Sequence, residues 1–546
     1  MKKLNFTKIF TIAFYLLFFL LLLKNSLGYL DPDLGWHLKA GEEVVKTGQI
    51  NQINHYNYIL EENNTWVNHE WLSDSIIFLI YNNYNYFTLN IVFALLMCLI
   101  LGIAHNFIVK NFTFDRKSKA VLLPFFALGI IACQPSLGVR IQELTILFLL
   151  LELIIIYKFE NESLKNNKYF WKKLLILPII IGLWANMHGG FLLGIFIMYF
   201  YLGIKTTELI IFYLKDKISF INKLSSFLNF NKKLNKKDLK IFLFFSIISS
   251  LSTLINPYGL KLFDFLFSYK NNAYLKIIGE WLPQYQEPFL YWQILYIGIT
   301  IAVYLVSFLM YKNKKEINSL WHLTLILFFI ILAIKSRRHF PLLFISSLPF
   351  LSVFIYDEIK ETIKNIKLGK TIIDIFIKAY LSFVFLFVFL LLATSIKVIK
   401  NPFTYYCQKY PCQALEFIKN DPKISSARIF NSYGWGGYLI HQWPEKKIFI
   451  DGRLPQIKIK DHSYLEEYLL FFKDEQSIKQ KIEEYQIELF LLEKRKTKKT
   501  KWLDQKLTGS KETKDKNNQL INYLEANFNK IYEDDIALIY FKRNGL

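Results

Sequence analysis

The sequence predicts an α-helical polytopic membrane protein with a C-terminal extracytoplasmic α/β domain. Three observations lead to this fold class. Of the 546 residues, 53% are hydrophobic and 17% aromatic, which is too apolar for a soluble protein with a solvated surface. Apolar runs alternate with short lysine-rich gaps as far as residue 398. Beyond that point, charged residues appear every few positions and the periodicity shortens.

We expect about eleven membrane spans. Several are shorter than the roughly twenty residues that a straight span needs, so their boundaries are soft. The first span has a basic flank at Lys2, Lys3 and Lys8, but no good cleavage site follows it, so we interpret it as a retained helix. The predicted spans are 9–24, 87–109, 120–134, 141–157, 174–187, 189–204, 241–256, 290–311, 319–335, 340–356 and 371–398.

The distribution of positive charge predicts the topology. With a cytoplasmic N-terminus, the cytoplasmic loops hold more than three times as many lysines and arginines as the opposite loops. The apolar run 174–204 must then fold back at Met187–Gly190, because both of its flanks are rich in lysine. An odd number of spans places the soluble domain, 399–546, outside the cytoplasm and leaves 1–398 as the membrane domain. Topology thus accounts for the net charge of +22, which argues against nucleic-acid binding.

The first outer loop, 25–86, is unusually rich in acidic residues and histidine. Asp33 stands at an N-cap position, and the apolar spacing behind it predicts a short helix that ends at Gly48. We expect this helix to lie along the bilayer surface, with Trp36 at headgroup depth. The Asp31-Pro32-Asp33 turn could hold a divalent cation (Mg²⁺ or Mn²⁺) or supply a general base. Alternatively, Asp33 is only a cap and Asp31 only a solvated turn residue.

The remaining polar islands fall on the same predicted face as this loop. Clustered polar groups at helix ends indicate a shared cavity. The alternative is that glycine, proline and asparagine merely form turns while arginines reach the lipid headgroups. The islands are Gln134–Glu143, Asn186–Gly190, Asn256–Gly259, Gly279–Pro283 and Lys335–His339.

The residue types in this predicted cavity form three sets. The cations Arg140, His188, Arg337 and Arg338 suit a phosphate on a lipid tail, and His37 and His69 are further candidates for substrate binding. The carboxylates Asp31, Asp33, Glu70 and Glu280 are candidates for catalysis. Flat faces for a sugar ring are offered by Trp36, Trp66, Trp71, Trp281 and Trp435, although interfacial tryptophans are common in membrane proteins.

In the C-terminal domain, 427–433, 446–453, 487–493 and 535–543 have strand character and 463–485 is helical. The polar, basic segment 494–518 is expected to be flexible. The stretch Asn431–Gln456 would bring Tyr433, Trp435 and Asp451 to one edge, where Arg453 could join them in binding substrate. It could equally be a structural glycine turn with an Asp451–Arg453 salt bridge.

Four cysteines imply no disulfide scaffold, although Cys407 and Cys412 could pair in an oxidising compartment. The sequence has no H-E-x-x-H zinc motif, phosphate-binding P-loop, G-x-S-x-G elbow or dinucleotide loop. Nucleotide-driven transport and serine hydrolysis are therefore excluded.

Several islands resemble motifs of a known class. DPDLGWHL (31–38), WVNHEWL (66–72), WANMHGG (184–190), NPYG (256–259) and WGGYL with DGR (435–453) resemble those of GT-C membrane glycosyltransferases. The closest resemblance is to poorly characterised bacterial multi-pass proteins. Two features depart from the oligosaccharyltransferases. W-G-G-Y lacks the aspartate of their W-W-D-Y-G element, and Arg140 and Glu143 stand where a second D-x-D is expected.

The resemblance implies a GT-C-like glycosyltransferase of the bacterial inner membrane. It would transfer a sugar, such as a hexose or pentose, from a polyprenyl-phosphate donor to a lipid, glycan or protein acceptor. Asp31 or Asp33 would be the base or metal ligand, and Glu280 a later acidic residue. Two other classes remain open: a flippase for lipid-linked sugars, which would place functional residues near the midplane, and a non-catalytic envelope scaffold.

Overall fold

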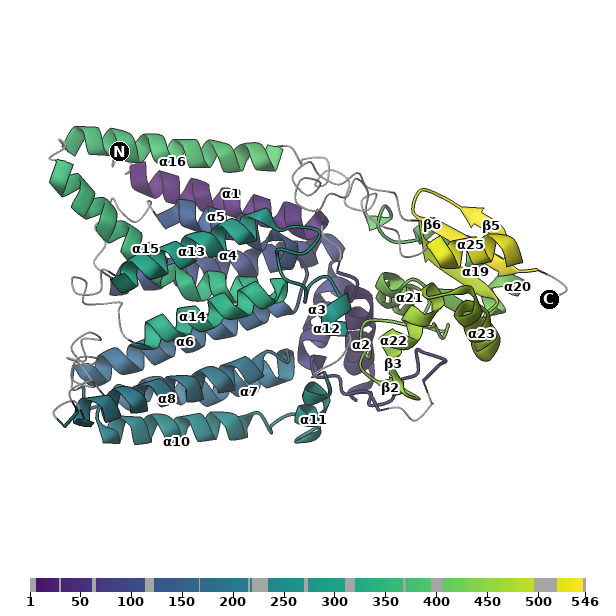
Figure 1. Ribbon diagram of the computed structural model, residues 1–546, viewed down its shortest axis with the longest axis horizontal. Coiled ribbons are helices and arrows are strands. Elements are labelled where there is room, and N and C mark those ends of the chain that lie inside the picture. The colour runs from purple at the N-terminus through teal and green to yellow at the C-terminus, as the bar shows by residue number, and fades with distance from the viewer. Residues whose placement is uncertain are drawn as a thin grey trace.

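The chain forms a helical bundle with a smaller C-terminal domain at one end, as the computed structural model shows (Figure 1). The structure describes residues 6–28, 31–60, 65–112, 122–165, 167–214, 217–218, 234–269, 274–309, 320–366, 370–393, 406–494 and 518–543. The predicted domain boundary at 398 and 399 lies outside these ranges, as does the segment predicted to be flexible, apart from Lys494 and Asn518.

Each predicted span contains a helix of the bundle. A helix satisfies every backbone group within its own segment, so it is the form that a long apolar run adopts away from water. The bundle helices are α1 (Phe6–Gly28), α4 (Tyr86–Asn111), α5 (Leu123–Cys133), α6 (Gln142–Leu164), α7 (Leu177–Met187), α8 (Phe191–Leu214), α10 (Lys236–Ser252), α13 (Tyr291–Leu309), α14 (Leu320–Lys335), α15 (Phe340–Ile366) and α16 (Lys370–Ala393).

The long apolar run before residue 204 folds back where the sequence predicts. Helix α7 ends at Met187, His188 has extended backbone angles, and α8 begins at Phe191. Successive bundle helices run in opposite directions (Figure 1). The turns 134–140, 188–190 and 336–339 therefore lie at the end of the bundle that carries the C-terminal domain.

The outside of the bundle is apolar. Leu16, Leu99, Leu183 and Phe383 are exposed on four different helices, and apolar exteriors of this extent mark contact with lipid. Four described helical segments are long and apolar enough to cross a membrane by length and composition: Lys8–Gly28, Tyr86–Asn111, Phe170–Met187 and Phe191–Leu214. Shorter apolar helices accompany them, so the chain is a membrane protein in which the number of eleven spans stays a prediction.

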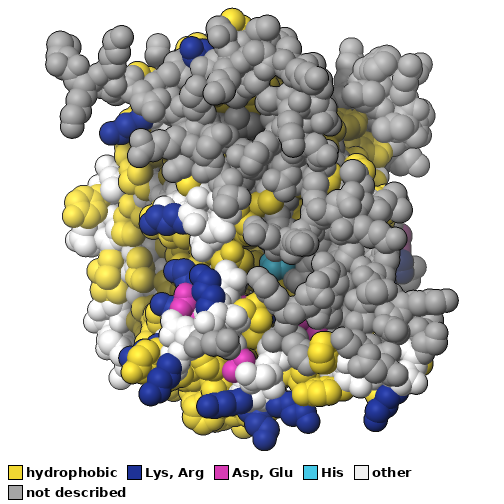
Figure 2. All heavy atoms as spheres, turned by 90° about the vertical axis from the view of Figure 1, so that its left-hand side faces the viewer, with side chains coloured by type: hydrophobic (Ala, Val, Ile, Leu, Met, Phe, Trp, Pro, Cys, Tyr) yellow, Lys and Arg dark blue, Asp and Glu magenta, His cyan; other side chains and the backbone are white. Residues whose placement is uncertain are grey.

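The other end of the bundle is rich in lysine. Figure 2 views this end directly and shows dark blue Lys and Arg side chains around its lower part. Exposed lysines here include Lys165 and Lys168 after α6, Lys172 before α7, and Lys236 and Lys237 at the start of α10. The two ends of the bundle therefore differ in charge.

The first outer loop contributes α2 (Leu34–Thr47) and α3 (Trp71–Asn83). The prediction of a helix between Asp33 and Gly48 is confirmed, and Gly48 ends it in the left-handed conformation at φ 68°. However, α2 does not lie free on the bilayer surface, because it packs between α3 and the C-terminal helix α21 (Gly436–Gln442). Trp36 is consequently buried in the core of the C-terminal domain, where protein covers it in place of lipid headgroups.

The C-terminal domain is built on a four-stranded mixed sheet in the order β1 (Ile429–Asn431), β4 (Leu489–Glu493), β6 (Ala537–Lys542), β5 (Phe528–Glu533). β1 and β4 are parallel, and the other pairs are antiparallel. The remaining elements are α19 (Cys412–Lys419), α20 (Pro422–Ser426), α22 (Tyr464–Leu469), α23 (Glu475–Tyr485), α25 (Asn518–Asn527) and the two-residue strands β2 (Lys458–Ile459) and β3 (His462–Ser463).

The segment 446–453, predicted to be a strand, does not join this sheet. Its Ile448 instead makes a parallel bridge with Asn57 of the first outer loop. The side chain of Asn431 in β1 contacts this segment by hydrogen bonds with the backbone of Phe449 and Ile450. Two short helices, α11 (Lys261–Ser268) and α12 (Tyr274–Ile277), also lie at this end of the bundle (Figure 1).

Glycines allow the first loop and the C-terminal domain to approach backbone to backbone. A Cβ atom on Gly35 would overlap the carbonyl of Gly437, and one on Gly437 would overlap the carbonyl of Pro32. Only glycine lacks the Cβ atom that would prevent this contact. The W-G-G-Y motif therefore has a packing role against α2.

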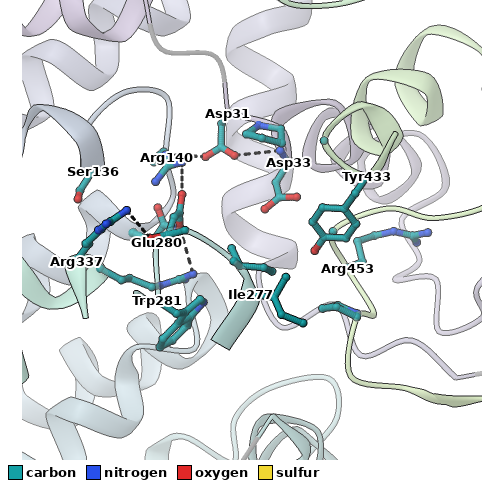
Figure 3. A pocket seen from close by; sticks show the side chains of 18 of the residues that line it. Asp31, Asp33, Ser136, Arg140, Ile277, Glu280, Trp281, Arg337, Tyr433 and Arg453 are labelled. Atoms are coloured by element: carbon teal, nitrogen blue, oxygen red, sulfur yellow. Dashed lines mark hydrogen bonds and ion pairs between the residues drawn. The ribbon is translucent and has the colours of Figure 1, made fainter. Parts of the chain in front are cut away.

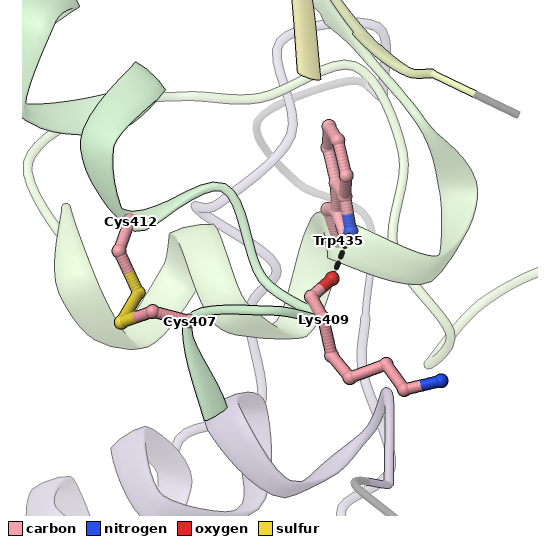
Figure 4. The surroundings of a disulfide bond; sticks show 4 residues. All are labelled: Cys407, Lys409, Cys412 and Trp435. Atoms are coloured by element: carbon pink, nitrogen blue, oxygen red, sulfur yellow. Dashed lines mark hydrogen bonds between the residues drawn. A yellow bond between two sulfur atoms is a disulfide. The ribbon is translucent and has the colours of Figure 1, made fainter. Parts of the chain in front are cut away.

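The structure joins Cys407 to Cys412 in a disulfide at the start of the C-terminal domain (Figure 4). Their Cα atoms are 5.5 Å apart, within the usual range for such a bond. Inside the loop that the disulfide closes, the Lys409 carbonyl accepts a hydrogen bond from the Trp435 indole at 3.1 Å. Trp435 is thereby fixed in the domain interior.

Candidate active site

A cavity of about 2380 Å³ lies at the junction of the bundle and the C-terminal domain. Most of the predicted site residues line it. They are Asp31, Asp33, Trp36, His37, His69, Glu70, Arg140, His188, Glu280, Arg337, Arg338 and Arg453. Trp71, Trp435 and Asp451 are not among its lining residues: the Trp71 indole donates to the Asn186 side chain at 3.0 Å, and Trp435 is held as described above.

The Arg140 guanidinium links two acids at the mouth of the bundle. Its Nε lies 3.1 Å from Asp31 Oδ2, and its terminal nitrogen pairs with Glu280 Oε1 (Figure 3). Arg140 is almost completely buried. Burial alone would raise the pKa of Glu280, but Arg140 and Arg338 hold it below its usual value. Asp31 and Glu280, more than 200 residues apart in the sequence, thus share one cation.

Asp33 is the acid of this group that no arginine neutralises directly. Its backbone N–H donates to Asp31 Oδ1 at 3.0 Å, and its own Oδ1 accepts from the Trp36 indole at 3.0 Å. Its carboxylate points into the cavity (Figure 3). Burial, reinforced by the negative charge of Asp31, raises the pKa of Asp33 to about 7. A carboxyl group with this pKa can accept and release a proton near neutral pH.

The C-terminal domain fixes Asp33 from the other side. A Cβ atom on Gly452 would overlap Asp33 Oδ1, so the D-G-R motif needs glycine at its centre. The position of Asp33 is therefore set jointly by α2, Trp36 and a loop of the C-terminal domain.

Arg337 organises the loop that carries Glu280. Its guanidinium donates to the carbonyls of Gly279 (3.2 Å), Pro283 (3.1 Å), Gln286 (2.6 Å) and Pro288 (3.0 Å). The backbone N–H groups of Arg337 and Arg338 also donate to Leu282 and Glu280 of this loop. Although Arg337 lines the cavity, four carbonyls already use its guanidinium.

Arg338 is better placed to meet an anion. Its side chain is 29% exposed, its guanidinium lies 4.9 Å from the centre of the Trp281 ring, and Nη1 is 3.8 Å from Glu280 Oε2. It thus adds a second positive charge beside Arg140 and a flat surface at the cavity wall.

A further acid of the cavity, Glu70, lies among three imidazoles. The Nε2 atoms of His188, His69 and His37 are 3.5, 3.6 and 3.9 Å from its carboxylate oxygens. Burial would raise the pKa of Glu70, but the neighbouring imidazoles of His69, His188 and His37, with the Arg338 guanidinium, lower it. Glu70 is therefore an ionised carboxylate in the wall of the cavity.

The histidines around Glu70 differ in protonation. His188 Nδ1 accepts from the Gly190 N–H at 3.1 Å and lies 2.6 Å from the Thr145 hydroxyl, which leaves the Nε2 proton directed at Glu70. Burial lowers the pKa of His188 to about 3, so this ring is neutral. Burial would also lower the pKa of His37, but Asp74, 2.7 Å from its Nδ1, raises it to about 9.

The His37–Asp74 pair predicts a pH-dependent stability. Because the folded pKa of His37 lies above its unfolded value of about 6.5, the stabilisation is complete below pH 6.5 and is lost as the pH rises through about 9. We expect Asp74→Asn to lower the free energy of unfolding at pH 6 by at most roughly 3 kcal/mol and to reduce the decline between pH 7 and 9.5. Glu70 and Asp33 also raise the pKa of His37, and burial raises the pKa of Asp74, so the loss is smaller than the full shift of His37. Chemical denaturation in detergent measures both effects, with Asp264→Asn on the exposed face of α11 as the matched control. If the free energy of unfolding declined equally with pH in wild type and Asp74→Asn, the assignment of His37 and Asp74 as a stabilising ion pair would be contradicted.

Arg453 and Asp451 form a buried clamp between the domains. Arg453 Nε and Nη2 lie 2.8 and 2.9 Å from the Asp451 carboxylate oxygens, and Nη2 also donates to Asn54 (3.0 Å) and Asn57 (3.1 Å) of the first outer loop. The Arg453 guanidinium lies 4.7 Å from the centres of the Tyr56 and Trp66 rings. This matches the salt-bridge alternative for the D-G-R motif.

The donor set at Asp31 and Asp33 does not fit a divalent cation. Both carboxylate oxygens of Asp31 are engaged, by the Asp33 N–H and by Arg140. Within the described parts of the chain, no group of three or more His, Cys, Asp or Glu side chains is arranged to hold a metal ion.

Some residues of the site escaped sequence analysis. Thr145 links Trp184 and His188: its hydroxyl donates to His188 Nδ1 and accepts from the Trp184 indole at 3.1 Å. Asn68 donates to Asp74 at 2.9 Å, and Asp74 is four residues from Glu70, on the same face of α3. That spacing was a usable signal for Asp74, whereas nothing in the sequence distinguishes Thr145 from other threonines in helices.

The bundle of membrane helices, with an acidic first outer loop and a C-terminal domain at one end, has the fold of solved oligosaccharyltransferase structures. Two solved structures from Archaeoglobus fulgidus share it. One is the archaeal oligosaccharyltransferase AglB in complex with an inhibitory peptide and a dolichol-phosphate, at 12% identity and a TM-score of 0.53, covering 89% of this chain and 69% of that one. The other is an oligosaccharyltransferase tethered to an acceptor peptide with the NVT sequon, at 12% identity and a TM-score of 0.54, covering 89% and 68%.

At this identity the likeness concerns the fold alone. No family model and no curated protein sequence matches the chain.

Proposed function

We propose that the protein transfers a sugar from a polyprenyl-phosphate donor to an acceptor hydroxyl at the outer face of the bacterial inner membrane. The observation that carries this proposal is the Asp33 carboxylate in a cavity that Arg140 and Arg338 also line, within a GT-C-like fold. The dolichol-phosphate in the AglB structure supports a lipid phosphate as the carrier.

In the proposed reaction, Asp33 removes the proton of the acceptor hydroxyl. The acceptor oxygen attacks the anomeric carbon of the sugar, and the bond from that carbon to the phosphate oxygen breaks. The lipid phosphate leaves with the electron pair of this bond, and the positive charges of Arg338 and Arg140 stabilise the charge that develops on it. Trp281 supplies a flat apolar surface next to the reacting groups.

We further propose eleven spans, with the lysine-rich end in the cytoplasm and the cavity outside. The concentration of lysines at the end opposite the cavity supports this orientation. The glycosyl donor would then enter from the outer leaflet, between bundle helices whose outward side chains are apolar.

This orientation makes a prediction for the cysteines. We expect Cys407 and Cys412 to be disulfide-bonded in cells, since only the exported side favours such bonds, while Cys98 and Cys133 stay free. When membranes are denatured, alkylated without reductant and analysed by mass spectrometry, only Cys98 and Cys133 should carry the label. Label on all four cysteines would place the C-terminal domain in the cytoplasm.

The test of the proposed function is turnover in liposomes. Purified protein is offered a panel of polyprenyl-phosphate sugars with candidate lipid, glycan and protein acceptors, and the release of polyprenyl phosphate is followed. Release that depends on Asp33 supports a glycosyltransferase. If no donor is consumed while a labelled lipid-linked sugar crosses the bilayer, the protein is a flippase.

A further inference from the structure

We infer that the Arg140 guanidinium takes the place of a divalent cation in this site, so that glycosyl transfer by this chain needs no metal ion. The catalytic half of this inference rests on the proposed function, whereas the cation-binding half rests on geometry alone.

Arg140 occupies the position of a cation that bridges two carboxylates. Arg140 lies between Asp31, from the loop after α1, and Glu280, from the loop before α13, and it contacts both carboxylates. Two carboxylates from different loops that meet at one cation are the arrangement that a bound divalent ion produces. Here a side chain fixed to the protein is that cation.

Charge supports the same assignment. Two arginines, Arg140 and Arg338, face the carboxyl groups of Asp31 and Glu280. The two guanidinium groups together carry the charge of one divalent ion. Adding an ion while Arg140 remains would place three or more positive charges within a few ångströms of each other, which is unfavourable in a partly buried site.

Arg140 lies on a turn that is fixed to the neighbouring helices. The turn that carries it is tied to α1 by Asn25, whose side chain donates to the carbonyls of Gln134 and Leu137 at 2.9 Å each. It is tied to α6 by Glu143, which accepts from the Gly138 N–H at 3.1 Å. The guanidinium is always protonated. The cation is therefore permanent, unlike an exchangeable ion.

Two measurements on the full-length protein in detergent test the inference. Electron paramagnetic resonance of Mn²⁺ reports cation binding without any reference to turnover. We expect wild type to show no stoichiometric Mn²⁺ binding at micromolar concentrations and Arg140→Ala to gain a site that Asp31→Asn removes. Arg140→Lys keeps the charge and should not gain it. Lys165→Ala, at the opposite end of the bundle, is the matched surface control.

The second measurement is donor turnover with and without a chelator. We expect the chelator to change the wild-type rate less than twofold. Arg140→Ala should be slower by about 100-fold and should recover about 10-fold with millimolar Mn²⁺ or Mg²⁺.

Several results would overturn the inference. One is tight, Asp31-dependent Mn²⁺ binding by wild type. Another is wild-type donor turnover that a chelator abolishes and that added Mn²⁺ restores. A folded Arg140→Ala protein that binds no Mn²⁺ would also contradict it. If that variant does not fold, the wild-type measurements still decide. If no variant consumes any donor, the proposed function fails, while Mn²⁺ binding still decides whether Arg140 occupies a cation site.

Discussion

Replacing Asp33 by Asn is expected to lower kcat for glycosyl transfer by about 1000-fold. The carboxamide keeps the shape of the side chain, and its oxygen can still accept from the Trp36 indole, but it cannot take a proton from the acceptor. Because Asp33 makes no direct ion pair with Arg140, its loss leaves the Asp31–Arg140–Glu280 link intact. Donor binding should therefore hardly change. The free energy of unfolding should not fall and should rise above pH 7, because burial raises the pKa of Asp33 and its ionised form therefore opposes folding.

The measurement is single-turnover release of polyprenyl phosphate, beside donor binding and thermal unfolding of the same samples. Asp461→Asn, an exposed aspartate of the C-terminal domain, is the matched control and should retain the wild-type rate. Substantial activity in Asp33→Asn would remove Asp33 as the base and leave Glu70 as the next acid to test.

Arg453→Ala is expected to destabilise the protein by about 3–5 kcal/mol. The substitution leaves the Asp451 carboxylate buried without its guanidinium, and it also removes the bonds to Asn54 and Asn57 that join the first loop to the C-terminal domain. Limited proteolysis should then cut between bundle and domain more readily, because the clamp no longer holds them together.

Chemical denaturation, monitored by tryptophan fluorescence, measures the loss of stability. Arg543→Ala is the control: this exposed arginine donates only to the Glu525 carbonyl among the bonds described, and its loss should cost within ~0.5 kcal/mol. The double variant with Asp451→Ala should lose less than the sum of the two single variants, since no lone charge remains. A loss below 1 kcal/mol in Arg453→Ala would instead favour a substrate-binding role for the D-G-R motif.

Sequence analysis succeeded where a pattern is local. Long apolar runs between lysines predicted the bundle helices, and the spacing after Asp33 predicted α2 with its glycine stop. The turn at His188 followed from charge on both flanks. These features depend on neighbouring residues alone, so a sequence contains them in full.

The missed features depend on contacts between distant segments. Trp36 has an interfacial sequence context, yet a helix from the other end of the chain covers it. The segment 446–453 has strand character, but its bridge partner is the first loop and not the sheet. Likewise, the sequence named Arg140, Asp31 and Glu280 as members of a cavity without revealing that the arginine links the two acids. Pairing of this kind is decided by packing.

The clamp between Arg453 and the first loop also bears on how the protein is made. The loop leaves the ribosome 399 residues before its partner arginine, counted from Asn54. At roughly 5–20 residues per second, the nascent loop waits on the order of half a minute for the domain that completes it. Until then Gly452 is absent from the side of Asp33, and α2 has no α21 to pack against. The surroundings of Asp33 are therefore complete only once residues near the end of the chain have been made.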